Sequence, residues 1–305
     1  MDTATLIEQL KVGVPRAISR AITLVENGSD ESDAILTSLD KKKIDDALII
    51  GITGFPGAGK STLVDRLITH YRAENHKIGV IAIDPTSPLT GGALLGDRIR
   101  MMNHSLDGGV FVRSMASRGR LGGLCASAGA SMRVMAAGGY SPILIETVGV
   151  GQSEMDIVNL ADVSILVLAP GLGDEIQAMK AGLLEVADII VVNKADLAGA
   201  QNLMKDMEEM VHMEKDRRFQ QVCLTTASEG KGITELAAII TNAQTTHLTT
   251  GERHRRREES RKKETLDWAI EMIRPKLANK LKKVFLEKAQ DPRTLAKLLV
   301  ESEKD

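Results

Sequence analysis

One stretch of the sequence has the residues needed to hold a chain of phosphates. Residues 54–61 read GFPGAGKS, a full G-x-x-x-x-G-K-S pattern between the apolar run ALIIGI and the helical pattern STLVDRLITHY. Glycine lets the backbone turn its N–H groups toward phosphate, and the start of the following helix adds partial positive charge. Lys60 is expected to reach the β- and γ-phosphates, and the Ser61 hydroxyl to bind Mg²⁺. The predicted nucleotide contacts in this segment are Gly54, Gly57, Ala58, Gly59, Lys60, Ser61 and Thr62.

Acidic residues that could hold the metal follow two apolar runs. Glu146 ends the run ILIE and is followed by T-x-G, the layout of a D-x-x-G switch with Glu in place of Asp, and the Gly149 N–H could sense the γ-phosphate. Asp84 ends IGVIAID, and Asp97 lies beyond TSPLTGGALLG. Each of these two aspartates is equally consistent with a helix cap or a turn. The predicted metal ligands are Ser61, Asp84, Asp97 and Glu146.

The residue after Gly149 bears on the rate of hydrolysis. Small signalling GTPases place a glutamine there to orient the attacking water, whereas this chain has Val150, which has no polar group for that task. Gln152 is a substitute or an exposed loop residue. The sequence therefore predicts slow hydrolysis that rises when a partner rearranges the switch loops.

A second motif indicates which base is bound. Asn193-Lys194-Ala195-Asp196 follows the apolar run DIIVV, and N-K-x-D is the base-reading pattern of GTPases. Asp196 can accept hydrogen bonds from the N1–H and the 2-amino group of guanine, which adenine does not offer. Thr226 and Ala227, after QVCLT, are placed in the last base-contacting loop, although a simple strand end would look the same. Because the motifs occur in the order found in GTPases, guanine is predicted.

The surrounding pattern predicts an α/β fold. Apolar runs alternate with amphipathic stretches, as in a mostly parallel sheet flanked by helices: ALIIGI, IGVIAID, GVFVRS, PILIETVG, SILVLAP, DIIVVNKAD and QVCLTTAS. We predict a P-loop domain over 45–245, an N-terminal helical extension over 1–44 and a C-terminal helical extension over 246–305, which is a candidate for dimerisation.

A long charged helix is predicted over residues 252–284. Glu252 and Arg256 are one of several pairs at i,i+4 spacing, so the basic cluster at 253–257 is interpreted as a solvated helix face rather than a nucleic-acid contact. Trp268, Ile270, Ile273 and Leu277 form an apolar stripe. Periodicity leaves open whether this stripe packs on its own domain or on a second subunit.

Composition limits the other classes of function. The 305 residues have 39 Lys and Arg against 41 Asp and Glu and only 2% aromatic residues, so neither nucleic acid nor a membrane is an expected partner. The N-terminus lacks the pattern of a secretory or transit peptide. Cys125 and Cys223 are far apart in sequence and suggest no disulfide framework. A cytoplasmic location is expected.

These motifs carry a family resemblance that covers nearly the whole chain. Together with GDRIRMM at 96–102, SRGRLGGL at 117–124, ETVGVGQSE at 146–154 and APGLGDEIQAMKAG at 169–182, they closely resemble the cobalamin-mutase chaperone GTPases. These are the methylmalonyl-CoA mutase-associated proteins, also labelled arginine/ornithine transport kinases. The resemblance implies a homodimeric GTPase that gates adenosylcobalamin loading into a mutase and protects or reactivates that enzyme.

The resemblance also assigns roles to single residues. It places Asp84, Asp97 and Glu146 around the metal. It places Asp174, Gln177 and Lys180 in a segment that relays the partner to the nucleotide, although Lys180 would otherwise be interpreted as a helix-surface lysine. The predicted catalytic residues are Lys60, Glu146 and Lys180. At 13–21, GVPRAISRA departs from the family's G-D-R-x-x-L-A-R-A, which puts contacts made there in doubt.

The sequence fits two other functions less well. A nickel-type metal-insertion GTPase shares the class, but the six histidines are scattered without metal-ligand spacing. A kinase linked to amino-acid transport would need a catalytic loop that the sequence does not display. The sequence does not identify the mutase or show whether cobalamin binds directly.

Overall fold

The fold is built on one parallel sheet. A computed structural model describes residues 2–84, 104, 106–116, 123–147, 159–171, 183–213, 219–285 and 291–301. Within these residues the strand order is β3-β2-β4-β1-β5-β6-β7, and every neighbouring pair is parallel. The strands are β1 (Ile49–Gly54), β2 (Ile78–Asp84), β3 (Val110–Ala116), β4 (Ile143–Thr147), β5 (Val163–Leu168), β6 (Ile189–Val192) and β7 (Gln221–Leu224).

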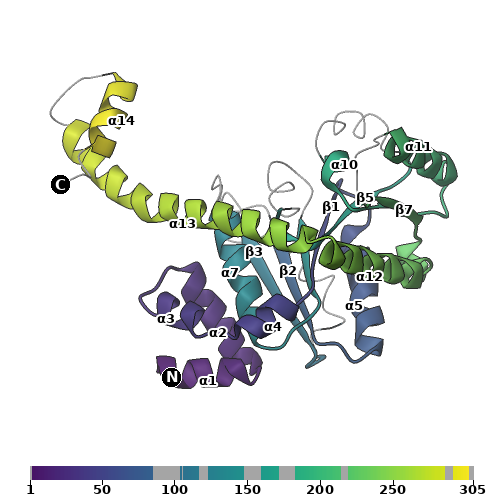
Figure 1. Ribbon diagram of the computed structural model, residues 1–305, viewed down its shortest axis with the longest axis horizontal. Coiled ribbons are helices and arrows are strands. Elements are labelled where there is room, and N and C mark those ends of the chain that lie inside the picture. The colour runs from purple at the N-terminus through teal and green to yellow at the C-terminus, as the bar shows by residue number, and fades with distance from the viewer. Residues whose placement is uncertain are drawn as a thin grey trace.

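Helices cover both faces of this sheet, which explains the continuous apolar runs (Figure 1). All residues of β1, β4, β5 and β6 are buried. Successive residues belong to different cores: Ile49 packs in the core that includes α7 (Gly123–Ala137), and Ile50 in the core that includes α5 (Lys60–Ala73) and α12 (Ile233–Thr249). A smaller core involves α10 (Leu183–Val186) and α11 (Ala200–Met213). The α/β prediction is confirmed.

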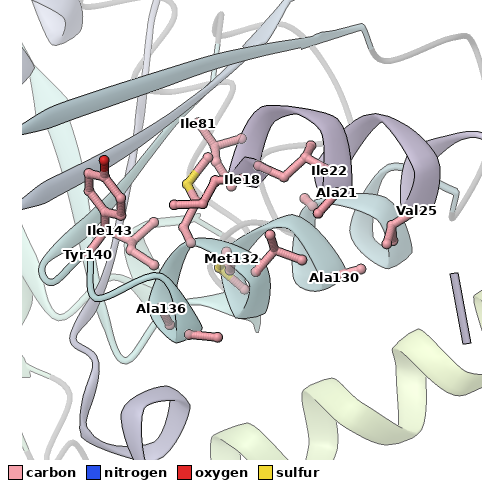
Figure 2. Close-up of a cluster of buried hydrophobic side chains, with 14 of the residues drawn as sticks. Ile18, Ala21, Ile22, Val25, Ile81, Ala130, Met132, Ala136, Tyr140 and Ile143 are labelled. Atoms are coloured by element: carbon pink, nitrogen blue, oxygen red, sulfur yellow. The ribbon is translucent and has the colours of Figure 1, made fainter. Parts of the chain in front are cut away.

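Four short helices precede the sheet. They are α1 (Thr3–Lys11), α2 (Pro15–Glu26), α3 (Ser32–Thr37) and α4 (Lys41–Asp46). Asp2 and Asp40 cap α1 and α4 by accepting backbone N–H bonds. Figure 2 shows Ile18, Ile22 and Val25 of α2 against α7, which places the N-terminal helices on one face of the sheet.

The C-terminal part is dominated by one long helix. The helix α13 (Glu252–Phe285) extends away from the sheet toward α14 (Pro292–Glu301) (Figure 1). Trp268 packs against the core beside α7, while Ile270 and Ile273 are exposed. In the described residues, no helix is both long and apolar enough to cross a membrane. The domain boundaries near 44 and 245 stay a prediction.

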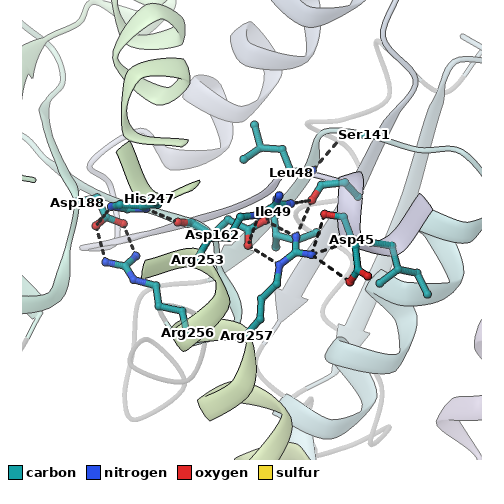
Figure 3. A network of polar contacts seen from close by, with 12 residues as sticks. Asp45, Leu48, Ile49, Ser141, Asp162, Asp188, His247, Arg253, Arg256 and Arg257 are labelled. Atoms are coloured by element: carbon teal, nitrogen blue, oxygen red, sulfur yellow. Dashed lines mark hydrogen bonds and ion pairs between the residues drawn. The ribbon is translucent and has the colours of Figure 1, made fainter. Parts of the chain in front are cut away.

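The predicted solvated face at 253–257 is wrong for three of its arginines. Arg253 and Arg257 bind Asp162, which lies just before β5, and Arg256 binds Asp188, just before β6 (Figure 3). Both aspartates are buried, so the arginines neutralise charges at the amino edge of the sheet. Their spacing on the helix resembled a surface pattern because the partners lie 68 to 95 residues away in sequence.

Candidate nucleotide-binding site

The loop between β1 and α5 has the backbone of a phosphate cradle. Gly54 and Gly59 have φ angles of 139° and 95°, and Gly57 has 78°. A Cβ atom on Gly54 would lie 2.1 Å from the Val167 carbonyl oxygen, and one on Gly59 would lie 2.3 Å from Asn193 Nδ2. Both glycines are therefore required by backbone conformation and by close approach. The loop between β1 and α5 therefore lies directly against Val167 of β5 and Asn193 after β6.

Lys60 begins α5 with its ammonium held inside this loop. The residue is only 6% exposed, and Nζ donates hydrogen bonds to the Gly54 carbonyl at 2.7 Å and the Phe55 carbonyl at 3.0 Å. These carbonyls hold the cation at the mouth of the loop, next to the first backbone N–H groups of the helix. The positive charge therefore lies where phosphate oxygens would approach.

Ser61 and Glu146 come together from α5 and β4. The Ser61 hydroxyl donates to Glu146 Oε1 at 2.6 Å, and Glu146 is 4% exposed. Beneath them, Thr147 and Thr53 join β4 and β1 through their hydroxyls at 3.2 Å. A buried hydroxyl and carboxylate side by side form a hard-oxygen pair of the kind Mg²⁺ prefers.

The rest of the predicted metal site lies only partly in the described structure. Asp84 is the last residue of β2, and the preceding Ile83 is in register with Thr147 of β4. The backbone of Asp84 therefore lies at the carboxyl edge of the sheet, as Glu146 does. Its side chain is outside the described residues, as is Asp97. No group of three or more His, Cys, Asp or Glu that could hold a metal occurs in the described parts. Mg²⁺ bound with a nucleotide takes most ligands from phosphate and water, so Ser61 and Glu146 suit it without such a cluster.

Asn193 connects the phosphate loop to the loop after β7. It is 3% exposed, and Nδ2 donates to the Ala58 carbonyl at 2.9 Å. Its Oδ1 accepts from the Thr225 hydroxyl at 3.0 Å and from the Ala227 backbone N–H at 3.1 Å. One amide side chain therefore fixes three segments at the carboxyl edge of the sheet. This is the bracing role expected for Asn193; contact with a purine remains a prediction.

The two segments beside Asn193 shape the expected base pocket. Lys194 has a φ of 57°, an uncommon conformation for a residue with a side chain. The Ala195 N–H donates to the Thr225 carbonyl at 3.0 Å, and Asp196 is solvent-exposed. Thr226 pairs with Lys231 through an isolated bridge that closes the loop containing Ala227. Asp196 and the Ala227 loop are thus held to neighbouring strands of one sheet.

Several predicted residues fall outside the described structure, and others were missed by the sequence. Those outside are Asp97, Gly149, Asp174, Gln177 and Lys180, together with Val150 and Gln152. Thr62 is described and lies exposed on the first turn of α5. Arg66 was missed: on α5, it donates to the carbonyls of Ala227 and Ser228. No local spacing signals such a contact, because its partners lie about 160 residues further along the chain.

Two side-chain contacts from α5 reach the segment that leads into β3. His104 Nε2 lies 3.0 Å from Asp65 Oδ1, and Arg72 binds Asp107 through both carboxylate oxygens at 2.8 and 2.9 Å. The Arg72 hydrogen bonds, reinforced by the Gly109 N–H, hold the pKa of Asp107 below its ordinary value. These contacts tie α5 to His104 and Asp107, just before β3.

A phosphate loop, a serine–carboxylate pair and an N-K-x-D loop at one edge of a parallel sheet define a P-loop protein of the GTPase class. The family model described as methylmalonyl-CoA mutase-associated GTPase MeaB matches residues 18–284. The chain therefore belongs to this family of GTPases, which implies guanine-nucleotide binding.

Relatives and a solved structure agree with this assignment. A putative GTPase of Pyrococcus abyssi is 52% identical over 76% of this chain and 72% of its own length. The GTPase ArgK of Escherichia coli is 33% identical over 92% of this chain and 87% of its own. The mouse methylmalonic aciduria type A homolog, a mitochondrial protein, is 35% identical over 67% of this chain and 50% of its own. The crystal structure of an LAO/AO transport system kinase superposes with a TM-score of 0.67 at 27% identity, covering 99% of this chain and 98% of the other.

Proposed function

We propose that this protein hydrolyses GTP to GDP and phosphate, with Mg²⁺, and uses that reaction as a chaperone of an adenosylcobalamin-dependent acyl-CoA mutase. The observation that carries the nucleotide part is the convergence of Lys60, the Ser61–Glu146 pair and Asn193 at one edge of the sheet. The partner part rests on membership of a family described by its association with methylmalonyl-CoA mutase.

Hydrolysis is proposed to use groups that the fold has already placed. Lys60, now bonded to the Gly54 and Phe55 carbonyls, would transfer its N–H donors to the β- and γ-phosphate oxygens and stabilise the charge that develops there. Ser61 and Glu146 would hold Mg²⁺, which neutralises phosphate charge when bound. Asp196 would select guanine through the N1–H and the 2-amino group. Each role follows from the type and position of one side chain.

We further propose that the isolated protein is slow and that its partner accelerates it. Val150 takes the place of a water-orienting glutamine, so another group must complete the site. Lys180, with Asp174 and Gln177, is our candidate for that contribution. Single-turnover hydrolysis with and without the purified mutase would measure the stimulation. Equal rates that are already fast would reject this part of the proposal.

A homodimer through α13 is proposed as the working assembly. From Leu266 onward this helix exposes several large apolar side chains, namely Leu266, Ile270, Met272, Ile273 and Leu281. Large exposed apolar side chains in one region are typical of an interface. Light scattering of wild type and Ile270→Glu tests this, with Lys262→Glu on the same helix as the control. A monomeric wild type at micromolar concentration would contradict it.

The decisive test of the nucleotide assignment is calorimetry on nucleotide-free protein with Mg²⁺. We expect heat from GTP and much weaker binding of ATP; equal binding of both would reject guanine recognition.

The partner is tested by a pull-down from cell extract with GDP and a GTP analogue, in which recovery of no mutase in either state counts against a chaperone role. Phosphotransfer to a purified amino-acid-binding protein would instead support the kinase alternative.

A further inference from the structure

Arg66 joins the helix that holds phosphate to the loop beside the expected base. It lies on α5, and its Nε donates to the Ala227 carbonyl at 2.9 Å while Nη2 donates to the Ser228 carbonyl at 2.8 Å. Hydrogen bonds from a charged guanidinium are stronger than neutral ones, and the planar fork fixes two acceptors at once. The side chain therefore orients two successive peptide groups of one loop.

The peptide groups around Ala227 are held from two directions. The Ala227 N–H donates to Asn193 Oδ1 at 3.1 Å, and its carbonyl accepts from Arg66 at 2.9 Å. Further along, the loop bonds to itself: Thr226 and Lys231 exchange backbone hydrogen bonds, and the Glu229 N–H donates to the Thr226 carbonyl. The loop over residues 226–231 is thus attached through Asn193 to the segment after β6 and through Arg66 to α5.

We propose that Arg66 is a positioning residue for guanine recognition, which sets the span between the phosphate loop and the base-contacting loop. The inference rests on the proposed GTP-binding function. Lys60 and Arg66 are on one rigid helix, about 9 Å apart along its axis at 1.5 Å per residue. A guanine nucleotide has to satisfy contacts at both ends, so a displaced base-contacting loop would leave polar groups of the base and the site unpaired. Adenine has no N1–H or 2-amino group for Asp196 to bind. The affinity for ATP should therefore depend little on the position of this loop.

The test compares GTP and ATP affinity in wild type and in Arg66→Met, a change that keeps an apolar stem and removes both donors. We expect the dissociation constant for GTP to rise about tenfold, while that for ATP changes by less than about twofold. The KM for GTP should rise with little change in kcat, because the phosphate contacts at Lys60 remain. A general loss of structure would instead weaken both nucleotides and lower kcat.

Arg72→Met is the matched control. Arg72 is on the same helix and also makes two charge-assisted bonds, but to Asp107 rather than to the base-contacting loop. Its loss is expected to leave the GTP-to-ATP affinity ratio at the wild-type value. An equal fall of the ratio in both variants would overturn the positioning role.

The outcomes separate this inference from the proposed function. If wild type shows no preference for GTP, the guanine assignment itself fails. If wild type prefers GTP and folded Arg66→Met keeps the wild-type ratio, the role of Arg66 is overturned while the function stands. Should Arg66→Met not fold, Arg66→Lys decides: its single ammonium lacks the planar fork, so an intermediate ratio supports the inference and a wild-type ratio overturns it.

Discussion

The two edges of the sheet use buried carboxylates in opposite ways. At the amino edge, Asp162 and Asp188 are 1% and 2% exposed and are bound by arginines of α13. At the carboxyl edge, Glu146 is 4% exposed and accepts from the Ser61 hydroxyl. Burial is nearly the same at the two edges. The two edges differ in a contact that each carboxylate makes: Asp162 and Asp188 bind arginine guanidinium groups, and Glu146 accepts from the Ser61 hydroxyl.

This difference distinguishes the structural ion pairs at the amino edge from the candidate binding site at the carboxyl edge. Asp188 accepts from Arg256 at 2.7 Å through both oxygens and from the Ser164 N–H and hydroxyl at 2.8 Å, so its hydrogen bonding is provided within the chain. Such a saturated pair holds α13 to the sheet. A carboxylate beside a serine is instead suited to a cation that arrives with the nucleotide. Changes at the two edges should therefore affect different measurements.

The largest effect is expected from Lys60→Ala at the carboxyl edge. Removing the ammonium beside the phosphates should lower single-turnover GTP hydrolysis by about 10³-fold, because the developing charge loses its main protein cation. The melting temperature should change little by comparison. Lys77→Ala, a lysine outside the site, is the control. Hydrolysis within tenfold of wild type would remove Lys60 from the catalytic set.

Next in size is Asp188→Ala at the amino edge. This change leaves Arg256 partly buried without its main carboxylate, and the free energy of unfolding should fall by about 3 kcal/mol in chemical denaturation. GTP affinity of the folded protein should stay at the wild-type value. Glu258→Gln, in an exposed pair with Lys262, should change the free energy of unfolding far less, because solvent screens that pair. Weakened GTP binding in Asp188→Ala would show that the two edges are not independent.

A third change tests selectivity rather than strength at the carboxyl edge. Asp196→Asn should weaken GTP by roughly 100-fold and admit xanthosine triphosphate, because an amide N–H faces the donors of guanine but suits the carbonyl of xanthine. Competition binding with both nucleotides measures the exchange. Asp206→Asn, an exposed acid on α11, is the matched control. Unchanged GTP affinity in Asp196→Asn would rule out the assigned base contact.

The same comparison shows what a sequence can predict. The phosphate loop and the sheet were predictable because their signals are local: glycines at fixed spacing, and apolar runs bounded by polar residues. The roles of Arg66, Arg253, Arg256 and Arg257 were not, since each binds a partner 68 to 162 residues away. Arg256 also pairs with Glu252 at i,i+4 spacing. That local pair indicates an exposed helix face and gives no sign of the buried pair with Asp188. Long-range partners of a helix-forming arginine leave no local pattern.

The smallest effect, and the one that sharpens the comparison most, concerns the pH dependence of the amino edge. Hydrogen bonds from Arg255, and then from Arg256, lower the pKa of Glu252 from 4.5 to about 2. Since the pKa is lower in the folded state, the ionised carboxylate contributes its full stability above about pH 4.5, and that contribution is lost as the pH falls toward 2. Glu252→Gln should therefore cost on the order of 2 kcal/mol at pH 7 and progressively less below pH 4.5.

Denaturation curves of wild type and Glu252→Gln from pH 7 to pH 3 would measure how the difference between their free energies of unfolding shrinks. In an Arg255→Met background the cost of Glu252→Gln should shrink, because the main cause of the lowered pKa has been removed. A cost that is the same at every pH would mean that Glu252 acts through packing and not through charge. GTP affinity should be unchanged throughout, because Glu252 belongs to the edge where the chain neutralises its own charges.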